Sequence, residues 1–293
     1  MTRPRHWMSP IALAASVLFA VPANAIDIMP GDYTVLPAGT NALLLYGQYS
    51  QSSKLKVDGV GEVPDSKLGL GIGIARYLHY TSVGGVPVGL QAFLPFGGFT
   101  EARIGGAEPL TKSGIGDLTF GITAWPLSSA DPTGTTLGVT AYVSLPTGAF
   151  RDEPGAINIG SGTWTFTPQI GLIQGLGNGF FFDGALDVAV RSDHSENGIE
   201  FSRDASVQVQ AYLRYQFSAT TNVSFGYSGT FGGKDFVNDT YAGTKTRSDQ
   251  LRLFGSTFLT PTLQVQGMIG TDLNTQGGFR NDFIGTVRLM KLF

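Results

Sequence analysis

Two histidines outside the first 25 residues, His79 and His194, are the side chains best suited to acid–base chemistry. A hydrolase built on either would need a serine within hydrogen-bond reach and a third group to hold the base. His194 has Asp193 and Ser195 as sequence neighbours, but adjacent residues in a polar loop do not make a triad. We therefore expect no enzymatic activity.

Metal and nucleotide sites lack their sequence patterns. The chain has no cysteine, which excludes thiolate catalysis and cysteine-ligated metal. The acidic residues near His194 are scattered without ligand spacing. The glycines of Gly69-Leu70-Gly71 and Gly114-Ile115-Gly116 precede neither a helical pattern nor a lysine, so they do not form phosphate loops. The sequence predicts no metal and no cofactor.

Apolar and polar residues alternate with a period of two through most of the chain, which predicts strands. Soluble sandwiches alternate as well. The last strand ends on an aromatic carboxy-terminus, Phe293, as is typical of outer-membrane β-barrels, and we expect the insertion machinery to recognise that end. Lys291 departs from the pattern, but a lysine near an interface can extend its amine to water. The predicted fold is all-β, a closed antiparallel transmembrane β-barrel.

Twelve strands are expected, an even number as in single-chain bacterial barrels. The first is short and the sixth contains Pro168, where we expect a bulge or a shifted boundary, so ten or fourteen strands stay open. Short turns alternate with long polar loops, which places the long loops outside the cell. The predicted strands are 41–50, 67–80, 85–96, 115–126, 135–147, 161–173, 179–191, 204–218, 221–232, 248–259, 262–274 and 280–293.

The faces of these strands separate lipid from lumen. Aromatic residues near the periplasmic interface share the outward parity at Tyr80, Phe180, Tyr215, Phe217 and Phe293, and the same count places Tyr77 and His79 inward. Charges on the inward parity have two interpretations: pairs that brace the barrel, or the lining of an aqueous path. The lumen-lining candidates are Asp117, Asp183, Asp187, Arg191, Tyr212, Arg214, Arg252, Phe254, Phe258, Asp272 and Arg288.

The charged candidates are four acidic and four basic residues, so no strong ion selectivity follows. The aromatic members suit small apolar or aromatic solutes better than sugars or phosphate, unless these rings pack beneath a folded loop. An open path and a blocked lumen both remain compatible with this face.

The N-terminus has the pattern of a secretory signal peptide over residues 1–25. Arg3 and Arg5 precede an apolar run, and Ala23-Asn24-Ala25 supplies the cleavage site. Residues 26–40 follow as a periplasmic tail, which we favour, or as a plug in the lumen, and 41–293 form the barrel. The mature chain has 17 basic and 22 acidic residues, a net charge of −5, which disfavours nucleic acid as a partner.

Four segments in order resemble the outer-membrane transporter family of the MetA-pathway of phenol degradation. The resemblance implies an outer-membrane protein linked to uptake of aromatic or other hydrophobic compounds. The segments are Pro30-Gly31-Asp32-Tyr33 with 36–41, Ser113-Gly114-Ile115-Gly116-Asp117-Leu118, Leu145-Pro146-Thr147-Gly148, and Asn158-Ile159-Gly160-Ser161-Gly162-Thr163-Trp164-Thr165-Phe166.

We therefore expect an outer-membrane channel for passive uptake of small hydrophobic or aromatic compounds. The alternative is a structural or surface-interaction barrel with a blocked lumen. Its expected partners are outer-membrane lipid, the insertion machinery and the solute itself.

Overall fold

The computed structural model describes residues 19–20 and 26–293, except for positions 152, 154, 197 and 246. The predicted signal peptide therefore lies outside the described residues, apart from the two-residue strand β1 (Phe19–Ala20). None of the described residues forms a helix long and apolar enough to cross a membrane.

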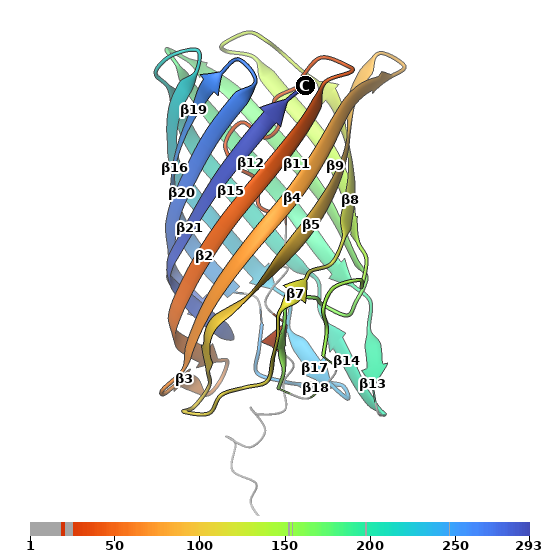
Figure 1. The fold of residues 1–293 in the computed structure, drawn as a ribbon, viewed down its shortest axis with the longest axis vertical. Helices are drawn as coiled ribbons and strands as arrows, with labels where there is room; N and C mark the ends of the chain where they lie inside the picture. Colours follow the sequence, from red (N-terminus) through yellow and green to blue (C-terminus); the bar gives the residue numbers. More distant parts are fainter. Residues whose placement is uncertain (1–18, 21–25, 152, 154, 197, 246) are drawn as a thin grey trace, which may run out of the picture.

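Twelve antiparallel strands close into a barrel, because the last of them pairs with the first (Figure 1). This confirms the predicted fold class and the count of twelve. Several strands extend beyond their predicted ends. The barrel strands are β2 (Asn41–Val57), β4 (Lys67–Val83), β5 (Val86–Arg103), β8 (Thr119–Leu127), β9 (Thr135–Ser144), β11 (Thr165–Gly177), β12 (Phe180–Arg191), β15 (Ser206–Gln216), β16 (Thr221–Gly232), β19 (Arg247–Thr260), β20 (Leu263–Gln276) and β21 (Gly278–Leu292).

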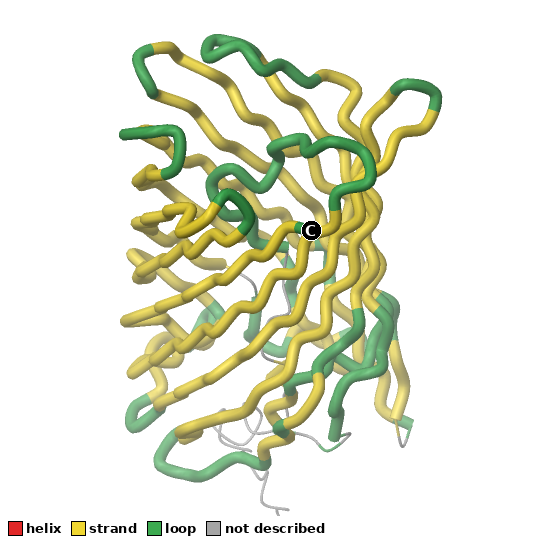
Figure 2. Tube along the Cα trace, turned by 45° about the horizontal axis from the view of Figure 1, so that its top comes forward, coloured by secondary structure: helices red, strands yellow, loops and turns green. Residues whose placement is uncertain are grey.

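Short turns gather at the end of the barrel that carries the C-terminus, as Figure 2 shows. The turn between β4 and β5 is Gly84-Gly85, and both glycines have positive φ angles of 58° and 84°. A two-residue turn with both central residues in this region follows the twist of the paired strands. In the barrel's expected orientation this end faces the periplasm.

Long connections at the opposite end form small sheets of their own (Figure 1). Asp58 accepts a hydrogen bond from Lys245 at 2.8 Å and another from Tyr241 at 3.1 Å, which ties two of these connections together. These bonds lower the pKa of the Asp58 carboxyl. The short strands of these small sheets are β6 (Thr111–Lys112) and β10 (Ile157–Asn158) in one, and β13 (His194–Glu196), β14 (Ile199–Arg203), β17 (Asp235–Val237) and β18 (Thr240–Tyr241) in the other. Two further short strands, β3 (Gly61–Val63) and β7 (Gly114–Ile115), pair with the barrel strands β2 and β5.

The outer wall exposes apolar side chains, as a lipid-facing surface requires. Val139 and Leu186 are 47% exposed on the outward parity of their strands. Near the short turns, the ring of Tyr215 lies 4.8 Å from both Phe180 and Phe217. This cluster occupies the level at which an aromatic girdle was predicted.

The parity predicted for β4 is wrong. Tyr80 is buried and stacks on Trp125 with ring centroids 5.7 Å apart, whereas Tyr77 is 43% exposed. His79 shares the outward parity of Tyr77. The physical reason is that the first half of β4 presents glycines to the lipid side, where a neighbouring ring lies over them: a Cβ on Gly73 would meet the Phe96 ring at 2.4 Å. Leucine and isoleucine of this strand therefore point inward.

At Pro168, where we expected a bulge or a shifted boundary, the described ladder has no bulge, but the boundary is shifted, since β11 runs over Thr165–Gly177 and not over 161–173. Pro168 pairs with Ala141 of β9 in an unbroken register. On the side of β12, pairing resumes at Gln169 in the same register, and the shift in this hairpin lies between Gly175 and Gly177 instead. The strand tolerates the missing N–H by omitting ladder bonds on one side only.

Candidate functional site

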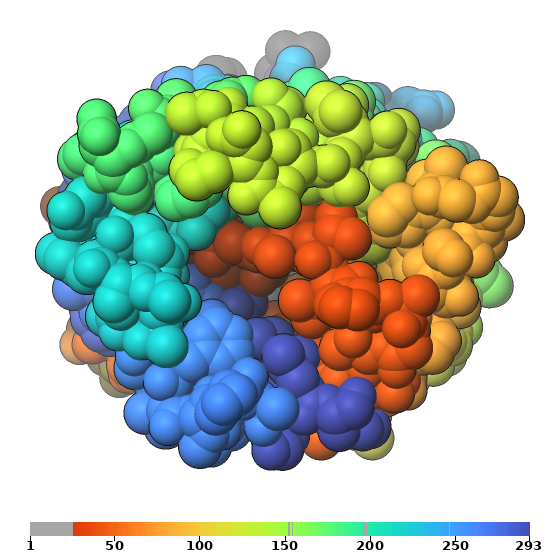
Figure 3. Space-filling view, turned by 90° about the horizontal axis from the view of Figure 1, so that it is seen from above, coloured from red at the N-terminus to blue at the C-terminus, as the bar shows by residue number. Residues whose placement is uncertain are grey.

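Residues 26–36, here called the lumen segment, run inside the barrel. Their contacts reach inward side chains of nine barrel strands, from Arg76 on β4 to Arg288 on β21. Seen from the end with the short turns, the segment lies across much of the opening (Figure 3). Of the two arrangements left open by the sequence, these residues adopt the one inside the lumen, and the favoured free tail does not describe them. Polar partners throughout the barrel interior explain this placement.

The lumen segment contains a tight turn at residues 29–32. The N–H of Asp32 donates to the carbonyl of Met29 at 3.0 Å, and Gly31 within the turn has a φ of 89°. This is the pattern of a type II turn, which favours proline at its second position and needs a positive φ at its third. The Pro30-Gly31 pair meets both requirements. The N–H of Gly31 donates to Asp183 Oδ1 at 2.9 Å. The turn therefore presents a backbone donor to the barrel wall.

Asp183 is itself held by an arginine. Arg214 Nε donates to Asp183 Oδ2 at 2.8 Å and Nη2 donates to Oδ1 at 3.3 Å, both inside the barrel. A two-point contact of this kind is charge-assisted and fixes both side chains. The guanidinium also lies 4.4 Å from the centre of the Phe181 ring.

Asp32 lies between two buried arginines. Arg288 Nη1 donates to its Oδ1 at 2.5 Å, and Arg76 Nη1 lies 3.4 Å from its Oδ2. Both arginines are at most 7% exposed. Two positive charges in this position require a negative partner, because an unpaired buried charge is costly. The carboxylate of the lumen segment supplies it.

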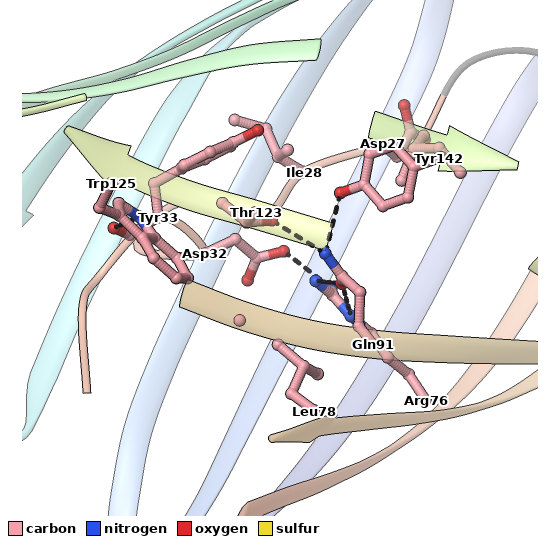
Figure 4. A pocket seen from close by; sticks show the side chains of 12 residues that line it. Asp27, Ile28, Asp32, Tyr33, Arg76, Leu78, Gln91, Thr123, Trp125 and Tyr142 are labelled. Atoms are coloured by element: carbon pink, nitrogen blue, oxygen red, sulfur yellow. Dashed lines mark hydrogen bonds and ion pairs between the residues drawn. The ribbon is translucent and has the colours of Figure 1, made fainter. Parts of the chain in front are cut away.

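Arg76 is positioned by the wall beside it, as Figure 4 shows. Its Nε and Nη2 both donate to Gln91 Oε1, at 3.1 and 2.6 Å. Gln91 in turn donates to Thr123 Oγ1 at 3.2 Å. A cavity of about 10 Å³ remains between these residues and the segment. That is space for about one water molecule, so the packing on this side is nearly complete.

Tyr33 packs on glycines. A Cβ added to Gly171 would meet its ring at 1.9 Å, and one added to Gly138 would meet it at 2.5 Å. Its hydroxyl donates to Gln169 Oε1 at 2.9 Å and lies 3.0 Å from Thr140 Oγ1. The ring thus lies flat against a wall that has no side chains at these two positions.

Replacing Gly171 by alanine is expected to loosen the lumen segment without opening the barrel wall. The added methyl group forces the Tyr33 ring to move, which weakens the hydrogen bonds of its hydroxyl. A loss of about 1.4 kcal/mol makes the state in which the lumen segment is released roughly ten times more populated. Because the chain has no native cysteine, a Met29→Cys reporter can measure release by its rate of maleimide labelling. Gly47→Ala is the matched control, since no atom lies within 4 Å of its added Cβ.

Beyond the segment, toward the long connections, the lumen holds a cavity of about 250 Å³. Its lining has two chemical characters. Leu68, Leu70, Met268 and Ile284 contribute apolar surface, while the remaining lining is mostly hydroxyl, amide and charged groups. The polar lining includes Gln48, Ser50, Asp27, Gln208, Thr230, Gln250, Arg252 and Asp272. The arrangement can hold a compact solute with an apolar body and a polar group.

The sequence-predicted candidates divide by location. Asp183, Arg214 and Arg288 hold the lumen segment as described above, Arg252 Nη2 pairs with Asp27 at 3.0 Å, and Asp187 accepts from Gln169. Tyr212 is fully buried, 4.9 Å from the Phe254 ring. Phe258 is half-buried near the short turns, and Arg191 ends β12 at the other side.

Two of the predicted candidates, Asp117 and Asp272, brace the end of the barrel that carries the long connections, and Asp272 also lines the cavity. Asp272 Oδ2 accepts hydrogen bonds from the backbone of Asn281 at 2.7 Å and from Thr275 at 3.1 Å. Asp117 accepts from Gly148 N at 2.8 Å and from Ser161 N at 2.7 Å. Asp117 thereby joins three of the segments that carry the family resemblance, and Gly148 and Gly160 approach so closely that a Cβ on either would meet the other at 2.7 Å.

Five residues that contact or form the lumen segment were not predicted from the sequence. Arg76 shares the parity of Tyr80, for which we predicted the outward face, so it was not among the lumen-lining candidates. An arginine in the middle of a membrane strand was itself a signal that this face points inward. The others are Asp27, Asp32, Tyr33 and Gln169, whose partners lie more than 100 residues away in several cases.

The histidines are placed in structural surroundings. His79 Nδ1 lies 2.9 Å from Asn41 Oδ1, and His194 stacks on Phe201 with ring centroids 5.0 Å apart. Within the described ranges, no three histidine or acidic side chains are grouped closely enough to hold a metal ion.

Comparisons with known proteins agree with this architecture. The chain is similar to an outer membrane channel from Pseudomonas putida F1, with 26% sequence identity, coverage of 91% of this chain and 100% of that chain, and a TM-score of 0.82. It is also similar to the transport unit of the autotransporter AIDA-I from Escherichia coli, at 10% identity, with 97% of both chains covered and a TM-score of 0.53, a likeness of fold alone.

No curated protein matches the chain. A family model described as "Putative MetA-pathway of phenol degradation" matches residues 39–289, a range that spans the barrel except for the last three residues of β21. This protein is an outer-membrane β-barrel and belongs to that family.

Proposed function

We propose that the protein is an outer-membrane channel for passive uptake of small hydrophobic or aromatic compounds. The observation that carries this proposal is the lumen cavity of about 250 Å³ with its mixed apolar and polar lining. A buried apolar cavity of about 150 Å³ already accommodates benzene. Membership of the phenol-degradation family supports this solute class, and similarity to a bacterial outer membrane channel supports passage through the barrel.

The path requires the lumen segment to move or to leave space beside it. Toward the short turns, a hollow remains next to the segment (Figure 3). We propose that the charged lumen residues, together with Tyr212, Phe254 and Phe258, line this path. The mixture of signs then provides polar contacts without a strong preference for one ion.

Filling the cavity is the direct test. Leu70→Trp adds volume inside the lumen, so uptake of a radiolabelled monoaromatic compound by cells should fall toward the rate of a deletion strain. Leu45→Trp, on the neighbouring strand and 50% exposed to lipid, should leave uptake unchanged. Equal uptake in both variants and in the deletion strain would reject the channel function.

A structural or surface-interaction barrel is the second candidate, favoured by the tight packing of the lumen segment around Arg76. It predicts no single-channel conductance in a planar bilayer under any condition that keeps the barrel folded.

Export and insertion complete the proposal. We infer cleavage after Ala25 by the secretory pathway and recognition of the C-terminal strand by the insertion machinery. The Phe293 ring is 64% exposed at the end of β21, while its backbone pairs with Asn41 at 2.8 and 3.0 Å. We also infer that the protein has no catalytic activity, consistent with the contacts of both histidines.

A further inference from the structure

Asp187 is a buried carboxylate whose charge lacks a partner among the described residues. It lies on the inward face of β12 and is 1% exposed. Its Oδ2 accepts a hydrogen bond from Gln169 Nε2 at 3.0 Å, and its Oδ1 has no hydrogen-bond partner. Such a carboxylate is expected to have a cation nearby, because its burial as an isolated charge is costly.

The neighbouring arginines are engaged elsewhere. Arg214 is paired with Asp183, and Arg252 is paired with Asp27. Arg191, the next charge along the same face of β12, is four residues away, roughly 13 Å along a strand. The surrounding groups on β11 and β15 are the neutral amides of Gln169, Gln208 and Gln210.

The backbone of Ile26 lies beside this carboxylate. Gln169 Nε2 donates both to the Ile26 carbonyl, at 2.8 Å, and to Asp187 Oδ2, at 3.0 Å. The two oxygens are therefore no further apart than 5.8 Å, the largest separation these two distances allow. The Gln169 amide is oriented by Tyr33, which donates to its oxygen. Gln210 also holds this part of the chain, donating to the Ile26 carbonyl and accepting from Ile28 N.

We propose that Asp187 is the binding site for the α-ammonium group of Ile26, which cleavage after Ala25 creates. Hydrolysis of the Ala25–Ile26 peptide bond converts an amide N–H into a protonated amine with three donors and one positive charge. That group supplies the cation that Asp187 lacks, and the ion pair fastens the start of the lumen segment to β12. Processing of the precursor thus completes the lumen. The inference rests on the cleavage site included in the proposed function.

The test uses protein purified from outer membranes after native processing. Mass spectrometry first establishes the mature N-terminus, and the labelling rate of the Ile26 amine by an amine-reactive reagent at pH 7 is then followed in detergent. Only the neutral amine reacts, so an ion pair that raises its pKa by one unit slows labelling about tenfold. Asp187→Asn is expected to restore the faster rate. Asp131→Asn, in an exposed turn remote from the lumen, is the control and should label like wild type.

A second variant guards against misfolding of Asp187→Asn. Insertion of one alanine before Ile26 leaves Asp187 intact but moves the amine by one residue, and labelling should again accelerate about tenfold. Equal labelling of wild type, Asp187→Asn and the insertion variant overturns the site, because burial alone would then explain the rate. A mature terminus at another residue overturns the inference through the cleavage site. Neither outcome touches uptake, which tests the channel separately.

Discussion

Replacing Asp32 by alanine is expected to release the lumen segment and raise the single-channel conductance. Asp32 pairs with Arg76 and Arg288, which are both buried. Removing one member of a buried ion pair costs about 3–5 kcal/mol, because the remaining charge is left uncompensated. Here the two arginines lose their shared partner, so most of the free energy that favours the bound position of the lumen segment is lost.

Conductance in planar bilayers measures the release of the segment, and reversal potentials in a salt gradient measure whether the channel prefers anions or cations. With Asp32 absent, the lumen gains net positive charge, so anions should be favoured over cations relative to wild type. Asp131→Ala removes an exposed carboxylate in the β8–β9 turn and should leave both readings unchanged. An Asp32→Ala protein that conducts like wild type would show that the ion pairs of Asp32 do not keep the lumen segment in its blocking position.

Placing arginine at Leu186 is expected to have the largest effect on barrel stability. Leu186 is 47% exposed on the outer wall and pairs with Val209 and Ile170, which face lipid as well. Arginine facing lipid near the bilayer midplane costs about 2–4 kcal/mol. The free energy of unfolding, measured by urea titration of protein refolded into vesicles, should fall by that amount.

The inward control for this substitution is Ser50→Arg. Ser50 lines the lumen cavity, where a guanidinium finds space and polar neighbours. Its cost should therefore be clearly smaller than that of Leu186→Arg. Equal losses of stability at both positions would mean that the outer face does not contact lipid while the inner face contacts water. That result would contradict a barrel in a membrane.

The barrel itself was predictable because its signal is repeated. Each strand carries its own period of two, and twelve such segments with alternating short and long connections agree on one closed architecture. An error in one segment, such as the parity of β4, leaves the others unaffected. Strand ends were less predictable, since β5 extends to Arg103 by pairing beyond the expected loop boundary.

The face that a strand turns to lipid was harder to predict for β4. Its leucines and isoleucines resemble a lipid-facing row, yet they point inward while Gly69, Gly71 and Gly73 face out. Hydropathy of one strand does not record that the Phe96 ring of the next strand covers the gap. This cross-strand contact decided the parity, and with it the location of Arg76.

The sequence by itself determined the compartment, the fold class and most of the inward charges, because these depend on local alternation and on the chain's last strand. Only the tertiary structure decided what the charges do. Asp32 meets Arg288 across 256 positions, and Tyr33 meets Gln169 across 136. Barrel closure creates those encounters, and no local pattern encodes them. The lumen segment, its arginine pair and the carboxylate of Asp187 are therefore properties of the closed barrel.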